Sequence, residues 1–253
     1  MNVIPTLIIV RNALDSCGIG TPQTHDGISI IPLIETGACH DPSNDASSTI
    51  SLFRALQQGV IKISEISDAG SVPDLFVRNL AGVPVLALDG EELEGANQNR
   101  VLQTSLLLAP GKGTLIPVNC VERGRWRCSG EKHFTHSGFH SPKLQRTRKA
   151  RSVNQSLTAA QSFSGNQAET WQGVSEMEGA FASPSPTGAS KNVYLAAARF
   201  VDEALVAFPC VEGQVGLIVF NKQRSIEGFD MVPNKAIYAD NHLGLVRSYL
   251  MSI

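Results

Sequence analysis

The sequence feature that most constrains the fold is a series of short runs rich in Val, Ile and Leu, most of which end at Gly, Pro or Asp. Alternating or β-branched runs of this length predict strands joined by turns. We expect such strands within residues 6–10, 28–34, 61–66, 76–90, 104–108, 114–121 and 213–221. The linker at 109–114 predicts a hairpin between the two strands that flank it. The core is therefore expected to be rich in β-structure.

Helical spacing of apolar residues is confined to a few segments. Leu52 and Leu56 predict a short helix that has Ser51 or Thr49 as its N-cap and ends at Gly59. Further helices are expected near residues 144–161, 194–205 and 243–250. Residues 128–190 are otherwise dominated by His, Ser, Gly, Arg and Gln, which predicts a loop-rich basic insertion. The predicted fold class is α+β: a single domain, residues 1–253, with a β-rich core sheet, a few flanking helices and this insertion.

The composition is that of a folded protein, not of a disordered or membrane-spanning one. Hydrophobic residues make up 42% of the chain and charged residues 17%. The apolar run from Ile4 to Val10 is broken by Pro5 and has no basic residue before it, so it predicts neither a signal peptide nor a membrane span. Five cysteines without a close pair fit a reducing compartment. We therefore expect a cytoplasmic protein.

Polar residues concentrate in the segment 91–100, directly after a strongly apolar strand. A rigid scaffold projects loop residues in such a position, and a Glu94 that lines a cleft can act as a general base. Gln98, Asn99 and Arg100 suit a ligand that carries hydroxyl or phosphate groups. The alternative is a hairpin whose acidic residues are simply solvated.

A second polar segment, residues 116–126, carries a candidate nucleophile. Alternation along a strand places Cys120 and Glu122 on the same face. Nearby Arg125 would lower the pKa of the Cys120 thiol, as a nucleophile requires, whereas a cysteine in an apolar strand can also be a small buried hydrophobic residue. Trp126 offers either stacking to a nucleotide or a structural cation–π pair with a neighbouring arginine. The catalytic candidates are thus Glu94, Glu122 and Cys120.

A group of possible metal ligands follows these segments. It consists of Cys128, His133, His136 and His140. Its spacing matches no structural zinc module, and the second ligand pair that closes a tetrahedral site is absent. We therefore expect neither a metal nor another cofactor.

Positive charge is unevenly distributed in a chain whose net charge is −2. Between Glu122 and Arg151 there are nine Lys or Arg residues and two acidic residues, and the run 143–151 is the most basic part. No RNA-binding signature and no phosphate-binding loop accompany this run. A solvated helix face or a contact between subunits of a homo-oligomer is favoured over nucleic-acid binding.

The two polar segments together resemble the domain family named for its association with ADP-ribosylglycohydrolases and rhodanese-phosphatase proteins. The resemblance rests on residues 88–100 and 116–126, with support from residues 183–188 and 213–216. It implies a role in binding or processing an ADP-ribose or other NAD-related nucleotide. The family pattern marks Glu94, Gln98, Asn99, Arg100, Cys120, Glu122, Gly124, Arg125 and Trp126.

Three functional hypotheses follow. In the first, the chain is an enzyme that acts on a nucleotide sugar, with Glu94 or Glu122 as acid or base. In the second, it binds a nucleotide or a partner protein without catalysis. In the third, both motifs are structural, with Glu94 and Glu122 paired to Arg100 and Arg125 so that loops are held on the β core. The sequence leaves open whether the protein is an enzyme.

Overall fold

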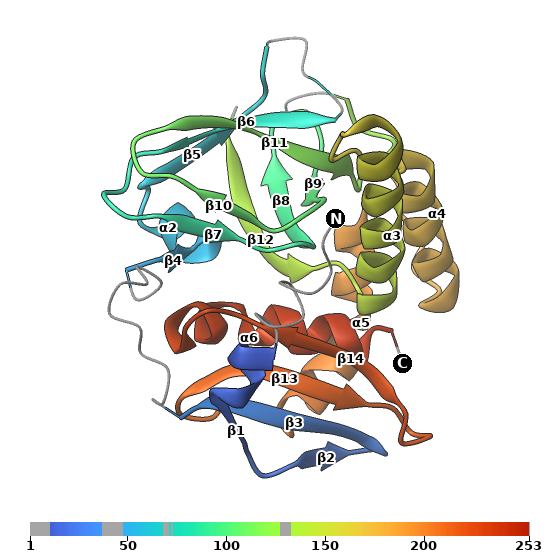
Figure 1. Ribbon diagram of the computed structural model, residues 1–253. Coiled ribbons are helices and arrows are strands. Elements are labelled where there is room, and N and C mark those ends of the chain that lie inside the picture. The colour runs from blue at the N-terminus through green and yellow to red at the C-terminus, as the bar shows by residue number, and fades with distance from the viewer. Residues whose placement is uncertain (1–10, 37–47, 68–70, 72, 127–132, 253) are drawn as a thin grey trace.

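The computed structural model describes residues 11–36, 48–67, 71, 73–126 and 133–252 of the 253-residue chain. Figure 1 shows two stacked halves with helix α6 (Lys235–Leu250) between them. The lower half contains a five-stranded sheet, and the upper half contains two further sheets. The strand predicted at residues 6–10 lies outside the described residues. The predicted α+β class is confirmed.

The sheet of the lower half joins the two ends of the chain. Its strands are β1 (Cys17–Ile19), β2 (Gln23–His25), β3 (Ile28–Glu35), β13 (Gln214–Phe220) and β14 (Ile226–Met231). β3 pairs with β13 in antiparallel register from Ser29 and Phe220 to Ile34 and Gln214. Helices α6 and α5 (Ser190–Leu205) pack against it in one apolar cluster that includes Ile30, Leu217, Tyr238 and Tyr249. This layer therefore needs strands from both the N-terminal and the C-terminal part of the chain.

The larger sheet of the upper half curls around a second apolar cluster. Its strands in spatial order are β12 (Phe134–His140), β8 (Glu91–Gly95), β9 (Arg100–Leu102), β11 (Gly113–Cys120), β6 (Asp74–Asn79) and β5 (Ile61–Ser64). A bridge between Ser64 and His133 brings the two outer strands together. The enclosed side chains include Leu75, Leu93 and Ile116, all with no exposed surface. The curl places the polar ends of β8, β9 and β11 close to one another.

A three-stranded sheet completes the upper half and corrects one prediction. It contains β10 (Leu106–Leu108), β7 (Val85–Ala87) and β4 (Ile50–Ser51). β10 pairs with β7, whereas β11 pairs with β6 and β9. The predicted hairpin across residues 109–114 is therefore wrong, because this linker crosses between two sheets. The short helix α2 (Leu52–Gln57) has the predicted cap, since the Ser51 hydroxyl accepts the N–H of Arg54 at 3.0 Å.

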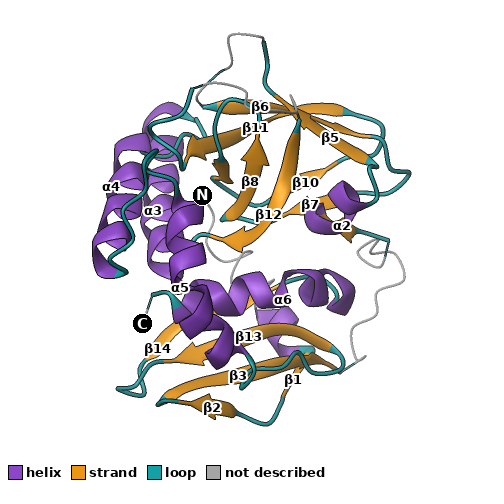
Figure 2. Cartoon of the chain, turned by 180° about the vertical axis from the view of Figure 1, so that it is seen from behind, coloured by secondary structure: helices purple, strands orange, loops and turns teal. Residues whose placement is uncertain are grey.

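The segment predicted as a loop-rich insertion is mostly regular structure. It contains β12, α3 (Lys143–Ala160) and α4 (Gln167–Ala180), and the last two stand side by side against the larger upper sheet (Figure 2). The helix expected at 144–161 is present, and residues 183–188 form a loop, but β12 and α4 add regular structure that the sequence pattern did not show. The buried positions of α3 are Arg146, Lys149, Ser152 and Val153. When a helix buries charged and small side chains, its apolar residues do not recur at helical spacing, and the sequence pattern then resembles that of a loop.

Candidate functional site

Glu92, on β8, is a buried carboxyl group held by three hydroxyl groups. It accepts hydrogen bonds from Ser141 at 2.9 Å, from Ser190 at 2.7 Å and from the phenol of Tyr194. Only 3% of Glu92 is exposed. Burial raises the pKa of Glu92 although these hydrogen bonds oppose the shift, and burial also raises the pKa of Tyr194. A carboxyl group of this kind stays protonated to a higher pH than an exposed one, as a general acid requires.

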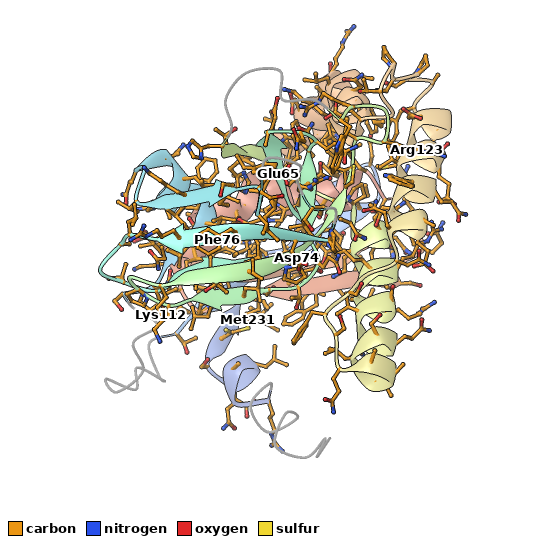
Figure 3. All side chains as sticks on the ribbon, turned by 90° about the horizontal axis from the view of Figure 1, so that it is seen from above. Glu65, Asp74, Phe76, Lys112, Arg123 and Met231 are labelled. Carbon is orange, nitrogen blue, oxygen red and sulfur yellow. The ribbon has the colours of Figure 1, made fainter. Side chains whose placement is uncertain are left out.

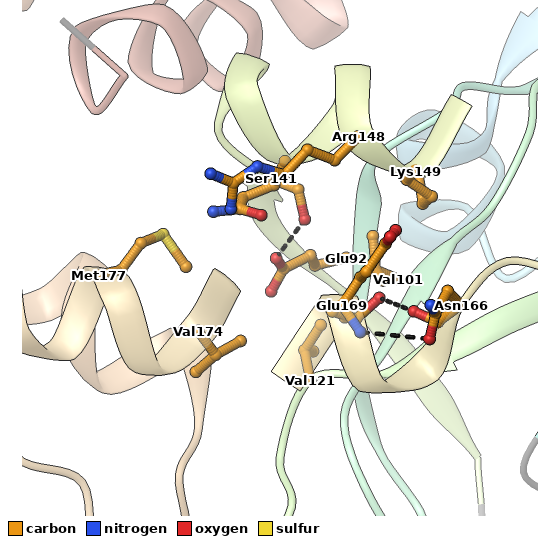
Figure 4. Close-up of a pocket in the computed structure, with 12 residues that line it drawn as sticks. Glu92, Val101, Val121, Ser141, Arg148, Lys149, Asn166, Glu169, Val174 and Met177 are labelled. Carbon is orange, nitrogen blue, oxygen red and sulfur yellow. Dashed lines mark hydrogen bonds between the residues drawn. The ribbon is translucent and has the colours of Figure 1, made fainter. Parts of the chain in front are cut away.

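Glu92 borders a pocket between the larger upper sheet and helices α3 and α4, which we call the Glu92 pocket (Figure 4). Its polar walls include Glu92, Arg148, Lys149, Asn166, Glu169 and Thr170. Its apolar walls include Val101, Val121, Val174 and Met177. The enclosed volume of the pocket is about 20 Å³, well below the usual size of a ligand site, although the pocket opens to solvent at its mouth. Its interior is narrow, with room for about one water molecule.

Two cations of α3 lie in the walls of the Glu92 pocket. The Nζ of Lys149 is 2.6 Å from a carboxylate oxygen of Asp89 and donates to the carbonyl oxygen of Leu102 at 2.5 Å. Burial lowers the pKa of Lys149, and the Asp89 carboxylate opposes this shift. Arg148 is partly exposed and pairs with Glu176 of α4 at 2.5 Å. The pocket therefore combines a carboxyl group of raised pKa with cationic side chains that suit an anionic ligand.

Part of the site predicted from sequence forms a second cluster. The Nε of Arg125 donates to Glu122 at 2.8 Å, and its Nη2 donates to the Asn99 side chain at 3.1 Å. The hydroxyl of Thr187 donates to the other carboxylate oxygen of Glu122 at 3.1 Å. Only 7% of Glu122 is exposed. These contacts join the turn after β8 to the loop that precedes α5, as expected of structural ion pairs.

The remaining predicted ligand-binding residues surround this cluster. Arg100 is fully buried, and its Nη1 donates to Gln98 at 2.7 Å. Gln98 in turn donates to the main-chain carbonyl oxygen of Glu122 at 3.0 Å. Trp126 is 45% exposed, and the Arg100 guanidinium lies 5.6 Å from its ring centroid. Trp126 thus forms a cation–π pair, but its partner is Arg100, which is not one of the neighbouring arginines predicted for that role.

Arg123 lies outside this cluster and contacts helix α4. Its guanidinium lies 5.2 Å from the ring centroid of Trp171. Figure 3 shows Arg123 beside α4 and far from Phe76, which lies on β6 at the other side of the sheet. The second polar segment therefore contacts both the sheet and the helices.

Cys120 lies against the Glu122 cluster, where its Sγ accepts the N–H of Glu122 at 3.4 Å, and Glu94 pairs elsewhere. Cys120 has no exposed surface, and burial raises the pKa of its thiol although Arg100 opposes the shift. Of the two alternatives for Cys120, the buried small hydrophobic residue fits and the lowered pKa does not, because desolvation outweighs the positive charge. Glu94 is partly exposed and forms an ion pair with Lys191. The acid or base roles of Glu94 and Glu122 stay predictions.

The histidines of β12 use their ring nitrogens within the protein or are buried. The Nε2 of His136 lies 3.2 Å from Glu91, and its Nδ1 accepts the N–H of Gly138 at 2.9 Å. Burial lowers the pKa of His140 well below its usual value. Cys128 lies outside the described residues. Within the described part of the chain, no three side chains of suitable type are arranged to hold a metal ion.

A family model matches residues 16–253, nearly the whole chain. It is described as the ARG and Rhodanese-Phosphatase-superfamily-associated Protein domain. The chain belongs to this family. No curated protein and no solved structure matches it. Across the described residues, no helix of this family member has the length and apolar character that crossing a membrane requires.

In this member of the family, the side chains around the Glu92 pocket lie partly within the two predicted segments and partly outside them. Glu92 lies in the first polar segment, and Lys149 lies in the basic run that was read as a solvated face. A signal was present in α5, where Ser190 and Tyr194 are four residues apart and so lie on one helix face. Two hydroxyl groups at this spacing suit a shared buried acceptor, but the sequence does not show that Glu92 is that acceptor.

Proposed function

We propose that this protein binds a nucleotide sugar of the ADP-ribose type in the Glu92 pocket and that Glu92 exchanges a proton with it. The observation that carries the proposal is the pocket's combination of a buried carboxyl group of raised pKa with the cations Lys149 and Arg148. Groups of this kind concentrate at functional sites. The name of the family supports the choice of ligand, since it refers to ARG proteins.

The size of the pocket determines how such a ligand would lie. Because the interior has room for about one water molecule, the ribose and phosphate groups would lie in the open mouth, and a single oxygen atom of the ligand would reach in toward Glu92. Arg148, Asn166 and Glu169 also line the pocket and offer donors and acceptors to phosphate and hydroxyl groups. The protonated Glu92 would then donate to an oxygen of the ligand.

A second candidate function is ligand binding without turnover. It is favoured by the contacts of Glu92, because Ser141 and Tyr194 donate to one carboxylate oxygen and Ser190 donates to the other. A carboxyl group with both oxygens occupied also serves as a fixed structural acceptor. The two functions differ in whether the ligand leaves the protein chemically changed.

Thermal unfolding with ADP-ribose, NAD and AMP, followed by mass spectrometry of the ligand, tests both functions. A ligand at about 100 times its dissociation constant adds about 2.7 kcal/mol to the free energy of unfolding. A raised midpoint with an altered ligand is the expected result. A raised midpoint with an intact ligand supports the binding module, and an unchanged midpoint with all three compounds refutes the proposed ligand class.

Three glutamate variants distinguish the Glu92 pocket from the site predicted by sequence. Glu92→Gln is expected to abolish turnover while ligand binding persists, and Glu94→Gln and Glu122→Gln are expected to keep turnover if they stay folded. Loss of turnover only in Glu94→Gln or Glu122→Gln would place the chemistry in the predicted site instead.

A matched pair on α3 tests ligand binding independently of catalysis. Arg148 lines the Glu92 pocket, whereas Arg151 is exposed and is not among the residues that line it. Arg148→Gln is expected to weaken binding about tenfold or more, as loss of a charge-assisted hydrogen bond does. Arg151→Gln is expected to bind as the wild type. Equal affinity in both variants would show that the ligand lies elsewhere.

A further inference from the structure

A second polar pocket lies where the two halves of the molecule meet. Leu88, Asp89 and Ser105 line it from the upper half, together with Arg146 of α3. The end of β14 and Leu245 of α6 line it from the lower half. Its volume is about 190 Å³, and we call it the junction pocket. A site of this size is smaller than most nucleotide or drug pockets, so it suits a small molecule or a single sugar ring.

The two carboxylates that line the junction pocket, Asp89 and Asp230, are paired with buried cations. Arg146 donates to both oxygens of Asp230, at 2.9 and 2.8 Å. Lys149 lies 2.6 Å from Asp89. The side chains of Asp89 and Asp230 are still 26% and 20% exposed, whereas those of Arg146 and Lys149 are 5% and 6% exposed. The pocket therefore presents acceptor oxygens to a ligand, with the cations buried behind them.

Donor groups complete the polar wall. The hydroxyl of Ser105 accepts the N–H of Asp89 at 2.9 Å, and its own proton has no acceptor among the described residues. The Nε of Arg146 is buried and likewise has no acceptor in the described part of the chain. A buried N–H without an acceptor destabilises the protein, but this one is closed off from the pocket, so the donor that a ligand can reach is the Ser105 hydroxyl.

The mixture of donors and acceptors selects the chemical class of the ligand. An anion would contact the acceptor-only oxygens of Asp89 and Asp230, which repel it. An added cation would lie near Arg146, Lys149 and Lys143, whose charges outnumber those of the two carboxylates. A hydroxyl group can donate to the carboxylates and accept from Ser105. We propose that the junction pocket binds a small neutral polyhydroxylated molecule, such as a pentose or a sugar alcohol.

Binding of a polyol in the junction pocket does not depend on the proposed function. The junction pocket and the Glu92 pocket lie on either side of the ion pair between Asp89 and Lys149, because Asp89 lines the former and Lys149 the latter. A free sugar can occupy the junction pocket whether or not a nucleotide sugar enters the Glu92 pocket. The two proposals are tested with different compounds, so a negative result for one does not contradict the other.

Nitrogen–proton correlation spectra of the isotope-labelled full chain test the inference. D-ribose and ribitol are titrated separately, with methylammonium and inorganic phosphate as charged probes. The expected result is a saturable shift of the Asp89, Gly90 and Ser105 amide signals with the two polyols and little change with either ion. Saturation only with methylammonium or only with phosphate would overturn the assigned class, and no saturable shift with any probe would overturn the site.

Substitutions of Ser105 locate the binding. Ser105→Ala removes one hydroxyl contact and is expected to weaken polyol binding about two- to tenfold. Ser105→Tyr fills the rim of the pocket and is expected to abolish saturable shifts while the remaining spectrum stays native. Ser225→Ala, on an exposed turn of the lower half, is the matched control and is expected to bind as the wild type. Unchanged affinity in Ser105→Tyr would show that the polyol binds outside this pocket.

Discussion

Replacing Asp230 with Asn removes the carboxylate that joins α3 to the lower half of the molecule. Both oxygens of Asp230 accept from Arg146, and one also accepts the Tyr249 hydroxyl at 2.7 Å. Arg146 is 4% exposed, so the substitution leaves a buried guanidinium without its counter-charge. Breaking a buried pair in this way costs about 3–5 kcal/mol. For a chain of this size, that loss lowers the unfolding midpoint by about 6–20 °C.

The pH dependence of the same pair has a definite sign. Burial alone would raise the pKa of Asp230, but the charge and hydrogen bonds of Arg146 outweigh burial, and the pKa is lowered. The stability from this pair is therefore present above the unfolded pKa of an aspartate, about 3.9, and is lost as the pH falls through the lower folded value. Asp230→Asn removes this part of the acid sensitivity. Urea unfolding between neutral pH and pH values near 3 measures both effects.

Two further variants make the test decisive. Arg146→Met in the Asp230→Asn background removes the unpaired charge and is expected to recover part of the lost stability. Asp202→Asn breaks the more exposed pair with Arg247 and is expected to cost at most about 1 kcal/mol. If Asp230→Asn destabilises the protein no more than Asp202→Asn does, the inferred connection between the two halves is refuted.

Three other predictions concern single positions. Burial raises the pKa of Glu92, so proton binding by Glu92 adds to the free energy of unfolding below about pH 4.3, and this contribution is lost as the pH rises through the folded pKa. Glu92→Gln cannot bind the proton and should therefore flatten this part of the pH profile measured by urea unfolding. Gly95→Ala should unfold at a clearly lower temperature than Gly111→Ala, since both have positive φ but a Cβ at Gly95 alone would collide with a main-chain carbonyl. An alkylating reagent should modify exposed Cys210 before buried Cys120, and mass spectrometry of the folded protein would contradict this if Cys120 reacted first.

Most strand positions could be predicted because one face of each strand is buried. Ile61 and Ile63 alternate with exposed Lys62, and the predicted run 61–66 appears as β5. Strand pairing was less predictable, because alternation identifies which side chains are buried but not which strand lies alongside. The wrong hairpin at 109–114 is an error of this kind. The single-domain organisation stays a prediction.

The basic run of α3 shows a second limit on what can be predicted from the sequence. Its cations looked solvated because charged residues rarely lie in a protein interior. Arg146 and Lys149 are buried because Asp230 and Asp89 meet them there. These partners lie 84 and 60 positions away along the chain, so no local pattern shows that the charges are neutralised. Half of a buried ion pair cannot be distinguished from a surface charge until the other half is placed.

The three glutamates of β8 show why residue type and spacing could not rank the catalytic candidates. Glu91 contacts His136, Glu92 is surrounded by hydroxyl groups, and Glu94 pairs with partly exposed Lys191. The partners of Glu92 come from positions 49 to 102 residues further along the chain. Proton affinity depends on such surroundings, and neighbouring carboxyl groups on one strand can therefore differ in function. The sequence pointed to β8 as a whole. The hydroxyl groups that α5 brings to Glu92 make this residue the strongest catalytic candidate of the strand.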